Sequence, residues 1–396
     1  MEIPGGILSA VTEAQVIEAL RPVQDPELHM SIVDLGMVKA VDVQGGTVGV
    51  LVALTVAGCP LRAEITERVT AALVPLEGID DVRVDMTVMT DEERHAVRER
   101  MGAQAGNGHA GHAHGAQGQG GQRLGHEDGR PNPFMAEGAK ARVLGVSSGK
   151  GGVGKSSVTV NTAIALARQG HDVAILDADV YGFSIPKMLG ITQDPVVIDD
   201  MIVPPVAHGV KVISIGFFVE ENQPVMWRGP MLHKALEQFL VDVYWGDPDY
   251  LLIDMPPGTG DVALSMAQYL PKSEVFVVTT PQAAAQRVAQ RTAFMARKVN
   301  LPLRGVVENM SWFTGHDGTR YELFGAGGGA ALAEELGVPL LGQVPLVPAL
   351  REGGDIGLPV TVSDPEGEAS QAFDAIAATI ATMGPARVFR SELKIN

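Results

Sequence analysis

Cysteine is almost missing from this chain, whose 396 residues contain only Cys59. A single thiol excludes any disulfide within the chain and is typical of a reducing compartment. Long apolar runs are missing too, since no stretch approaches the roughly 18 apolar residues of a transmembrane helix. The N-terminal residues MEIPGGILSAVTEAQ lack the basic start of a secretory signal peptide. We therefore expect a cytoplasmic protein.

Basic side chains are scarce as well: 30 Lys and Arg face 47 Asp and Glu, which gives a formal net charge of −17. This surplus of negative charge opposes partners that are held by phosphate neutralisation, such as bulk nucleic acid, and it opposes an anionic membrane surface. Apolar side chains, by contrast, make up 45% of the sequence. The composition predicts a globular protein that binds neither nucleic acid nor membrane.

One segment differs in composition from the rest of the chain. Residues 101–122, MGAQAGNGHAGHAHGAQGQGGQ, are typical of a flexible linker because they offer almost nothing to bury. We predict a linker over 101–135 between a small α/β domain at 1–100 and a larger domain at 136–396. Three linker histidines are candidate metal ligands, although a solvated linker is favoured because a flexible tether holds no ring in place. They are His109, His112 and His114.

The spacing of apolar residues predicts the secondary structure of both domains. In the first domain it indicates helices at 12–21 and 61–76 and strands at 46–56 and 82–89. In the second domain we expect strands at 142–147, 173–177, 210–214, 250–254, 275–279 and 303–307, with helices at 156–169, 231–244, 262–270, 283–299, 330–336 and 369–383. Continuous apolar strands that alternate with helices indicate an α/β fold with a mainly parallel sheet covered on both faces. Ligands bind such sheets at the carboxyl ends of the strands.

A glycine-rich motif lies at one of these strand ends. Residues 149–156, GKGGVGKS, match the phosphate-loop pattern G-x-x-x-x-G-K-[ST] and have a predicted strand before and a predicted helix after. The glycines let backbone N–H groups turn toward phosphate oxygens, and the helix N-terminus adds the positive end of its dipole. Lys155 would lie between the β- and γ-phosphates, and Ser156 would place its hydroxyl on Mg²⁺. A glycine-rich turn with coincidental lysines is the alternative.

Two other strand ends supply carboxylates. Asp254 follows an apolar strand and would hold Mg²⁺ through water, as the strand-end aspartate of phosphate-loop enzymes does. Asp179 ends the run ILDAD at 175–179 and would orient the attacking water. Each aspartate taken alone could also be a helix cap or a solvated turn residue.

The general phosphate-loop pattern does not require Lys150, the other lysine of the loop, and its role is indicated by a resemblance to a known family. The segments GKGGVGKS, DADVYGFSIP (177–186), DMPPGTGD (254–261), TTPQ (279–282) and VVENMSWF (306–313) resemble the Mrp/ApbC family of iron–sulfur cluster carrier ATPases, within the wider group of MinD, ParA and nitrogenase iron protein. The resemblance implies an ATP-dependent homodimer in which Lys150 reaches the partner's phosphates and Asn309 hydrogen-bonds adenine. The candidate catalytic residues are then Lys150, Lys155 and Asp179, the candidate magnesium ligands are Ser156 and Asp254, and the candidate nucleotide-binding residues are Gly149, Lys150, Gly151, Gly152, Val153, Gly154, Lys155, Ser156, Ser157 and Asn309.

The first domain carries a resemblance of its own. QDPELHMSIVDLG (24–36) and TVAGCP (55–60) resemble the small iron–sulfur assembly domain that precedes the ATPase in many bacterial Mrp proteins. The resemblance implies that Cys59, the cysteine before proline, is the functional thiol, and a position at a helix N-terminus would favour its thiolate. A buried, inert cysteine is the alternative. Asp25 and Asp34 could equally be turn and cap residues.

The sequence departs from the family at one position of consequence. Many members carry a C-x-x-C pair shortly after the ENM motif, where this chain has the segment 312–320, WFTGHDGTR. Because iron–sulfur clusters normally take four ligands, two Cys59 thiolates in a dimer would need histidine, a small thiol or a partner's cysteine in addition. His316 is one candidate ligand, and a histidine on a loop surface is its alternative.

Two classes of function are consistent with these features. The leading hypothesis is a Mg²⁺-dependent ATP hydrolase that binds iron–sulfur clusters and transfers them to apoproteins, with cluster assembly factors as further partners. The alternative is a MinD- or ParA-like switch, or a scaffold ATPase, with no cluster of its own. A MinD-like membrane role is disfavoured because the helix predicted at 369–383 has no Lys or Arg.

Overall fold

The computed structural model describes residues 11–26, 28, 30–55, 61–106, 131–198, 200–219, 229–258 and 260–386. By its contacts the chain divides into two compact units, Met1–His114 with Val196–Val203 and Gly115–Pro195 with Pro204–Asn396. No helix in the described part of the chain is both long enough and apolar enough to cross a membrane.

The first unit is a small sheet with helices packed against it. In chain order its elements are α1 (Glu13–Leu20), β1 (Val38–Gln44), β2 (Thr47–Leu54), α2 (Arg62–Leu73), β3 (Asp81–Val88), α3 (Asp91–Gly106) and the hairpin of β6 (Val196–Ile198) and β7 (Met201–Val203). Strand β2 lies between β1, to which it is antiparallel, and β3, to which it is parallel. Thr12 caps α1 through a reciprocal pair of hydrogen bonds with Gln15, which is why the helix begins there.

The predicted linker starts too early. Helix α3 continues to Gly106, and Met101, the first residue of the predicted linker, is fully buried. The polar sequence of α3 hides this helix from a composition argument, because only a few of its side chains, such as Val97 and Met101, are apolar and buried. Residues 107–130 of the predicted linker lie outside the described residues, and the short helix η1 (Pro133–Met135) occupies its end. The division into domains itself stays a prediction.

The second unit is built on one large sheet. Its elements are, after η1, β4 (Arg142–Ser148), α4 (Lys155–Arg168), β5 (Val173–Asp177), α5 (Ile185–Met188), β8 (Val206–Ala207), β9 (Val210–Ser214), η2 (Ile215–Phe218), α6 (Gly229–Asp242), β10 (Tyr250–Asp254), α7 (Gly260–Tyr269), β11 (Glu274–Thr279), α8 (Ala283–Lys298), β12 (Leu303–Glu308), β13 (Phe313–Thr314), β14 (Arg320–Tyr321), α9 (Gly328–Leu336), β15 (Leu340–Gln343), α10 (Pro348–Ile356), α11 (Val360–Ser363) and α12 (Glu368–Met383).

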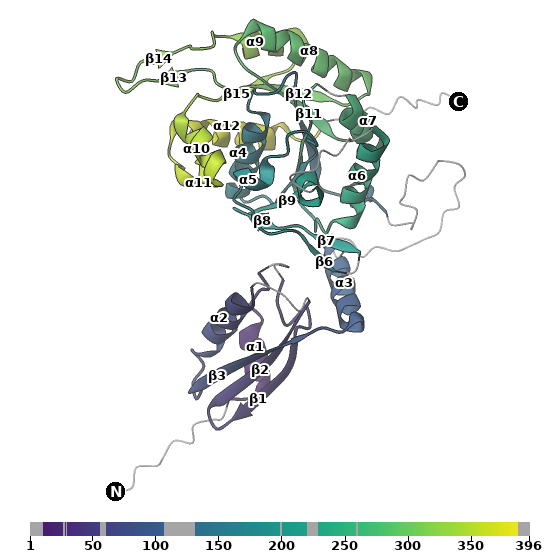
Figure 1. Ribbon diagram of the computed structural model, residues 1–396, viewed down its shortest axis with the longest axis vertical. Helices are drawn as coiled ribbons and strands as arrows, with labels where there is room; N and C mark the ends of the chain where they lie inside the picture. The colour runs from purple at the N-terminus through teal and green to yellow at the C-terminus, as the bar shows by residue number, and fades with distance from the viewer. Residues whose placement is uncertain are drawn as a thin grey trace, which may run out of the picture. The chain divides into compact units, whose positions relative to one another are not determined.

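The large sheet is parallel except at one edge. In the described residues its strand order is β15-β12-β11-β4-β10-β5-β9-β8, and only β8 runs antiparallel to its neighbour. Helices α4 and α12 cover one face, and α7 and α8 cover the other (Figure 1). The predicted α/β fold with helices on both faces is therefore confirmed.

Burial explains why strands of this sheet could be predicted from the sequence. Every residue of β5 and β10 is buried, and both strands have the bounds predicted from their continuous apolar runs. Between them and α4 and α12 lies the main core, which includes Ile175, Leu252 and Phe373. The carboxyl ends of all strands of this sheet other than β8 lie at the same end of the sheet, where the glycine-rich loop begins.

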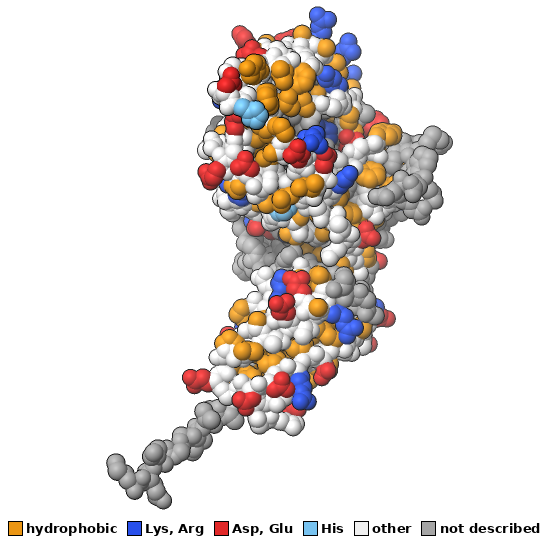
Figure 2. Space-filling model, turned by 60° about the vertical axis from the view of Figure 1, so that its left-hand side comes forward, with side chains coloured by type: hydrophobic (Ala, Val, Ile, Leu, Met, Phe, Trp, Pro, Cys, Tyr) orange, Lys and Arg blue, Asp and Glu red, His pale blue; other side chains and the backbone are white. Residues whose placement is uncertain are grey.

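The surface carries charges of both signs. On the face that Figure 2 shows, Lys and Arg side chains of the described residues are interspersed with Asp and Glu and are not gathered into a stripe. On this face of the described residues, no basic stripe of the kind that nucleic-acid-binding proteins carry is seen.

Candidate functional site

The glycine-rich loop connects β4 to α4 at the carboxyl edge of the sheet. Gly152 and Gly154 both have a φ of +78°, a left-handed conformation that favours glycine, and Gly154 is the N-cap of α4. A Cβ atom on Gly149 would lie 2.2 Å from the backbone nitrogen of Ala289 in α8. A Cβ atom on Gly154 would lie 2.2 Å from Nδ2 of Asn309. Conformation and close approach thus both require glycine in this loop.

Two adjoining cavities open beside the loop. One of about 420 Å³ is lined by residues 150–157 together with Asp179, Tyr181, Pro256 and Pro257. The other, of about 390 Å³, is lined by Asn309, Met310 and residues 345–347. Gly154 and Ser157 line both cavities, so the two cavities adjoin along the glycine-rich loop and offer a continuous site for an elongated ligand.

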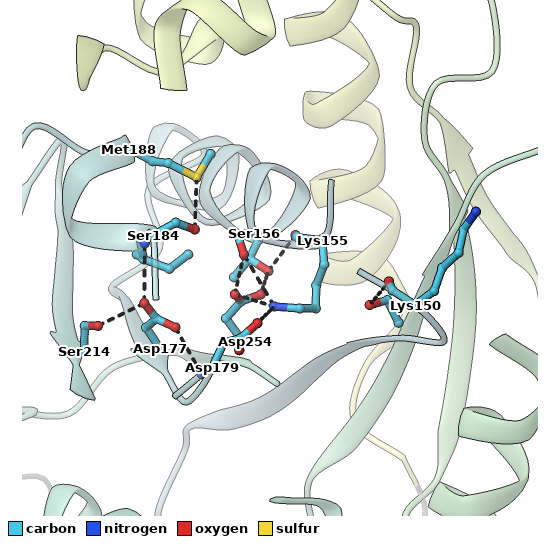
Figure 3. Close-up of polar contacts among 12 residues, drawn as sticks. Lys150, Lys155, Ser156, Asp177, Asp179, Ser184, Met188, Ser214 and Asp254 are labelled. Atoms are coloured by element: carbon cyan, nitrogen blue, oxygen red, sulfur yellow. Dashed lines mark hydrogen bonds and ion pairs between the residues drawn. The ribbon is translucent and has the colours of Figure 1, made fainter. Parts of the chain in front are cut away.

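A buried carboxylate lies at the base of the first cavity. Oδ2 of Asp254 accepts hydrogen bonds from Nζ of Lys155 and Oγ of Ser156, both at 2.6 Å, and its Oδ1 accepts one from Oγ1 of Thr159 at 2.7 Å (Figure 3). Asp254 is fully buried. Oxygen donors of this type are the ligands that Mg²⁺ prefers, so the residues present fit the ion that the sequence predicts here.

A second carboxylate, Asp179, faces the same lysine. Its Oδ2 lies 3.5 Å from Nζ of Lys155, and its Oδ1 is buried and has no hydrogen-bond partner among the described residues. The two aspartates predicted at separate strand ends therefore meet at one lysine.

A third aspartate belongs to this cluster, although the sequence analysis did not single it out. Asp177 pairs in register with Asp254 on β10, and its side chain accepts hydrogen bonds from Oγ of Ser214 at 2.9 Å and from the backbone N–H of Asp179 at 3.2 Å. Burial, followed by the nearby Asp254 carboxylate, raises the pKa of Asp177 from 3.8 to about 7. The available signal was the pair Asp177 and Asp179, because alternate residues at the end of a strand share a face.

Lys150 lies apart from these groups. Its Nζ donates to Oε1 of Gln282 at 3.2 Å, and Figure 3 shows its side chain pointing away from Lys155 and Asp254. Gln282, in the TTPQ segment, was not among the predicted site residues. Within its own chain Lys150 therefore does not contact the carboxylates.

Asn309 joins the loop to the second cavity. Its Nδ2 donates to the backbone oxygen of Val153 at 2.9 Å, and its buried Oδ1 has no hydrogen-bond partner in the described part of the chain. Since the amide donor is already used, the oxygen remains available to accept a hydrogen bond from a ligand.

Five further candidate residues remain, of which the structure describes only His316. Cys59 and the linker histidines His109, His112 and His114 lie outside the described residues. His316 lies in the turn between β13 and β14. Among the residues that the structure describes, no group of three His, Cys, Asp or Glu side chains could hold a metal ion.

Asp25 has the turn position that the sequence left open, whereas Asp34 lies at the surface and is not a helix cap. Oδ1 of Asp25 accepts from the N–H of Leu28 at 2.8 Å, and Asp34 pairs with Arg21 at 3.1 Å.

Comparison with known proteins assigns this arrangement to a family. Residues 140–381 match the NUBPL iron-transfer P-loop NTPase family. The chain belongs to this family. Residues 13–86 match a second family, described as iron-sulfur cluster assembly protein. The P-loop NTPase and the N-terminal assembly-like domain that the sequence motifs indicated are thereby confirmed.

Individual relatives of this NTPase family are similar over most of their length. A Mycobacterium tuberculosis protein named iron-sulfur cluster carrier protein is 48% identical over 376 residues, which are 93% of this chain and 93% of that protein. A Synechocystis protein of the same name is 41% identical over 378 residues, 94% of this chain and 97% of that protein. A solved nucleotide-binding protein of Archaeoglobus fulgidus in complex with ADP is 35% identical, with a TM-score of 0.51, and covers 59% of this chain and 92% of that chain.

Proposed function

We propose that this chain hydrolyses ATP with Mg²⁺ and, as a homodimer, carries iron–sulfur clusters to apoproteins. The observation that carries the ATPase proposal is the meeting of Lys155, Ser156 and Asp254 under a glycine loop that lines a cavity. The cargo is inferred from the relatives named iron-sulfur cluster carrier proteins.

In the proposed reaction a water molecule attacks the γ-phosphorus and the bond to the ADP oxygen breaks, which yields ADP and inorganic phosphate. The backbone N–H groups of residues 149–157 would bind phosphate oxygens, and Lys155 would offset negative charge on them. The unpartnered Oδ1 of Asp179 would orient the attacking water. Mg²⁺, held by Ser156 and Asp254, would neutralise phosphate charge when bound.

Lys150 would act on the partner subunit. Because its side chain bonds Gln282 and points away from Lys155, it is free of the carboxylate cluster in its own chain. We propose that it reaches the phosphates bound by the second subunit. Asn309 would accept a hydrogen bond from the adenine amino group through Oδ1.

The cluster would be a transient cargo of Cys59. One thiolate per chain gives a dimer two sulfurs, so the remaining ligands of a cluster would come from His316, a small thiol or the cysteines of a partner. In this proposal the partners are cluster assembly factors and apo iron–sulfur proteins. The protein would act in the cytoplasm, as expected from the sequence.

A switch or scaffold ATPase with no cluster of its own remains the second candidate. The observation in its favour is that no cysteine occurs in the ATPase domain, at residues 136–396.

The ATPase proposal is tested with Lys155→Ala. Loss of the ammonium should weaken ATP binding about 10- to 100-fold, since it removes a charge-assisted hydrogen bond. Calorimetric titration with Mg-ATP measures this, with the exposed Lys298→Ala as the matched control. Equal affinities in Lys155→Ala and the wild type would contradict the assignment.

The cargo proposal is tested by anaerobic reconstitution with iron and sulfide, followed by visible absorption and iron counting. A chromophore present in the wild type and lost in Cys59→Ala is the expected result. If neither protein gains a chromophore, the switch or scaffold function becomes the better explanation, whereas a reduced yield in His316→Ala would add that histidine to the ligands.

A further inference from the structure

Glu308, the last residue of β12, is a buried acid that the proposed chemistry does not use. Its side chain is fully buried and accepts hydrogen bonds from three separate elements. Oε1 accepts from Oγ of Ser311 at 2.9 Å and from Nε2 of Gln343 at 2.6 Å, and Oε2 accepts from the backbone N–H of Gly329. The N–H of Gly329 and Nε2 of Gln343 are donors, so each carboxyl oxygen accepts at least one hydrogen bond here.

The first of these elements is the N-terminus of α9. Its N-cap, Gly327, has a φ of +74° and supplies no side-chain cap, so the Glu308 carboxyl group takes that place at the N–H of Gly329. A Cβ atom on Gly329 would lie 2.6 Å from Cβ of Glu308. The glycine at position 329 is therefore explained by its close approach to Glu308.

The second element is the turn that follows β12. Ser311 donates through Oγ to the backbone oxygen of Glu308 at 3.0 Å as well as to its side chain, and its N–H donates to Val344. Between them Met310 has a φ of +59°, a conformation that a residue with a side chain rarely adopts. Such a conformation persists only where the surrounding bonds hold it.

This turn forms one wall of the second cavity. Asn309 and Met310, the two residues between Glu308 and Ser311, both line it. The position of the free Oδ1 of Asn309 thus depends on a turn that Glu308 and Ser311 hold at both ends.

We propose that Glu308 is a positioning residue for recognition of the nucleotide base. It holds the turn 309–310 so that Oδ1 of Asn309 accepts a hydrogen bond from the exocyclic amino group of adenine. Guanine carries a carbonyl oxygen at the same position, and two acceptor oxygens repel each other. The ligand class is an adenine nucleotide in preference to a guanine nucleotide. This inference rests on the proposed ATPase function.

The test is Glu308→Gln, which keeps the shape of the side chain. One carboxyl oxygen becomes an NH₂ group that faces a donor, so at least one of the three hydrogen bonds is lost. With the loss of the fixed turn, the affinity for Mg-ATP should fall about tenfold and the preference for ATP over GTP should fall about tenfold, because each corresponds to about one well-placed hydrogen bond. KM for ATP should change more than kcat, because Glu308 contacts neither Lys155 nor the carboxylates in the described structure.

Glu368→Gln is a matched control. Glu368 also accepts from three donors, namely Trp312, Thr314 and Arg320, but it holds the β13–β14 hairpin and lines neither cavity. It should keep the wild-type ratio of ATP to GTP affinity. Ser311→Ala removes one of the three donors to Glu308. It should lower the ratio of ATP to GTP affinity, as Glu308→Gln does, but by less. This variant tests the proposal if Glu308→Gln does not fold.

An unchanged ratio in folded Glu308→Gln would overturn the positioning role while leaving the ATPase function intact. An equal loss of ATP and GTP affinity together with a lower melting temperature would also overturn it, because a general structural role predicts that pattern. Failure of the ATPase function itself is recognised separately, because the wild type would then bind neither nucleotide.

Discussion

At the scale of single residues, the site is a set of acids packed around one lysine. Asp254 is satisfied by three donors, Asp179 has a free oxygen, and Asp177 lies behind both. Their hydrogen-bond environments differ, and Asp177 is the one whose pKa is raised by burial and by the Asp254 carboxylate. Asp177 is the member whose proton should be visible in the stability of the protein.

Asp177 is expected to make stability depend on pH. Its pKa is raised from 3.8 to about 7 in the folded chain by burial and by Asp254, so the folded chain keeps a proton that the unfolded chain releases. The free energy of unfolding should therefore fall as the pH rises through this window and change little from this group above it. Urea unfolding without nucleotide, between about pH 5 and about pH 8, measures this dependence.

Asp177→Asn should flatten that dependence, because its amide does not titrate. Asp194→Asn, at an exposed position in the same unit, should keep the wild-type slope. Identical slopes in all three proteins would show that Asp177 does not hold the proton.

The sequence predicted part of this cluster's membership. Lys155, Ser156 and Asp254 follow from a motif and a strand end, and the structure brings them into contact. Thr159 and Ser214 could not be found in the same way, because a hydroxyl group in a helix or at a strand end has no spacing that distinguishes it from a solvated one. Thr159 and Ser214 contact the aspartates because of the way in which elements distant in the sequence pack side by side, and this packing cannot be inferred from spacing.

At the scale of elements, strands with a continuous apolar run or a regular apolar alternation were predictable, as the half-exposed β3 shows, and strands with neither pattern were not. β5 and β10 were found with their bounds because every residue is buried and all but the terminal aspartate are apolar. β1, with the sequence VKAVDVQ and a largely exposed surface, was missed, and so were the very short β13 and β14. A strand of two residues is defined by its pairing partner, and pairing leaves no trace in composition.

The contact between α8 and the glycine loop gives a prediction at this scale. Gly149→Ala would place a Cβ atom 2.2 Å from the backbone of α8, so α8 or the loop must move. We expect a loss of about 1–3 kcal/mol in the free energy of unfolding, as for other overpacked sites. Chemical denaturation without nucleotide is the measurement.

Gly151→Ala is the control for this experiment. A Cβ atom there meets nothing within 4 Å, and Gly151 has no positive φ, so its stability should stay near that of the wild type. Comparable losses of stability in the two variants would mean that any side chain in the loop is destabilising, and that the contact with α8 is not the cause.

At the scale of the whole molecule, two units of different size share one chain. The larger unit holds the carboxylate cluster and both cavities, and the smaller one holds the segment that contains the lone cysteine. The proposed carrier function therefore requires that the nucleotide state of one unit affect cargo on the other, and the homodimer is the proposed means.

Lys150→Ala tests the dimer. If Lys150 reaches the partner's phosphates, the variant should bind ADP as the wild type does but remain monomeric with a non-hydrolysable ATP analogue. Light scattering after size-exclusion chromatography gives the mass directly. A dimer of normal stability in the variant would assign the interface to other residues.

The large sheet also ends in a way that restricts how copies can associate. Its two edge strands, β8 and β15, comprise only Val206–Ala207 and Leu340–Gln343. Edges this short offer few free backbone groups to a strand from another molecule, which protects the large sheet against edge-to-edge aggregation when the protein is crowded. Contacts between copies of this unit are therefore favoured at loops and helix surfaces, and such contacts can form and dissolve again without refolding the large sheet.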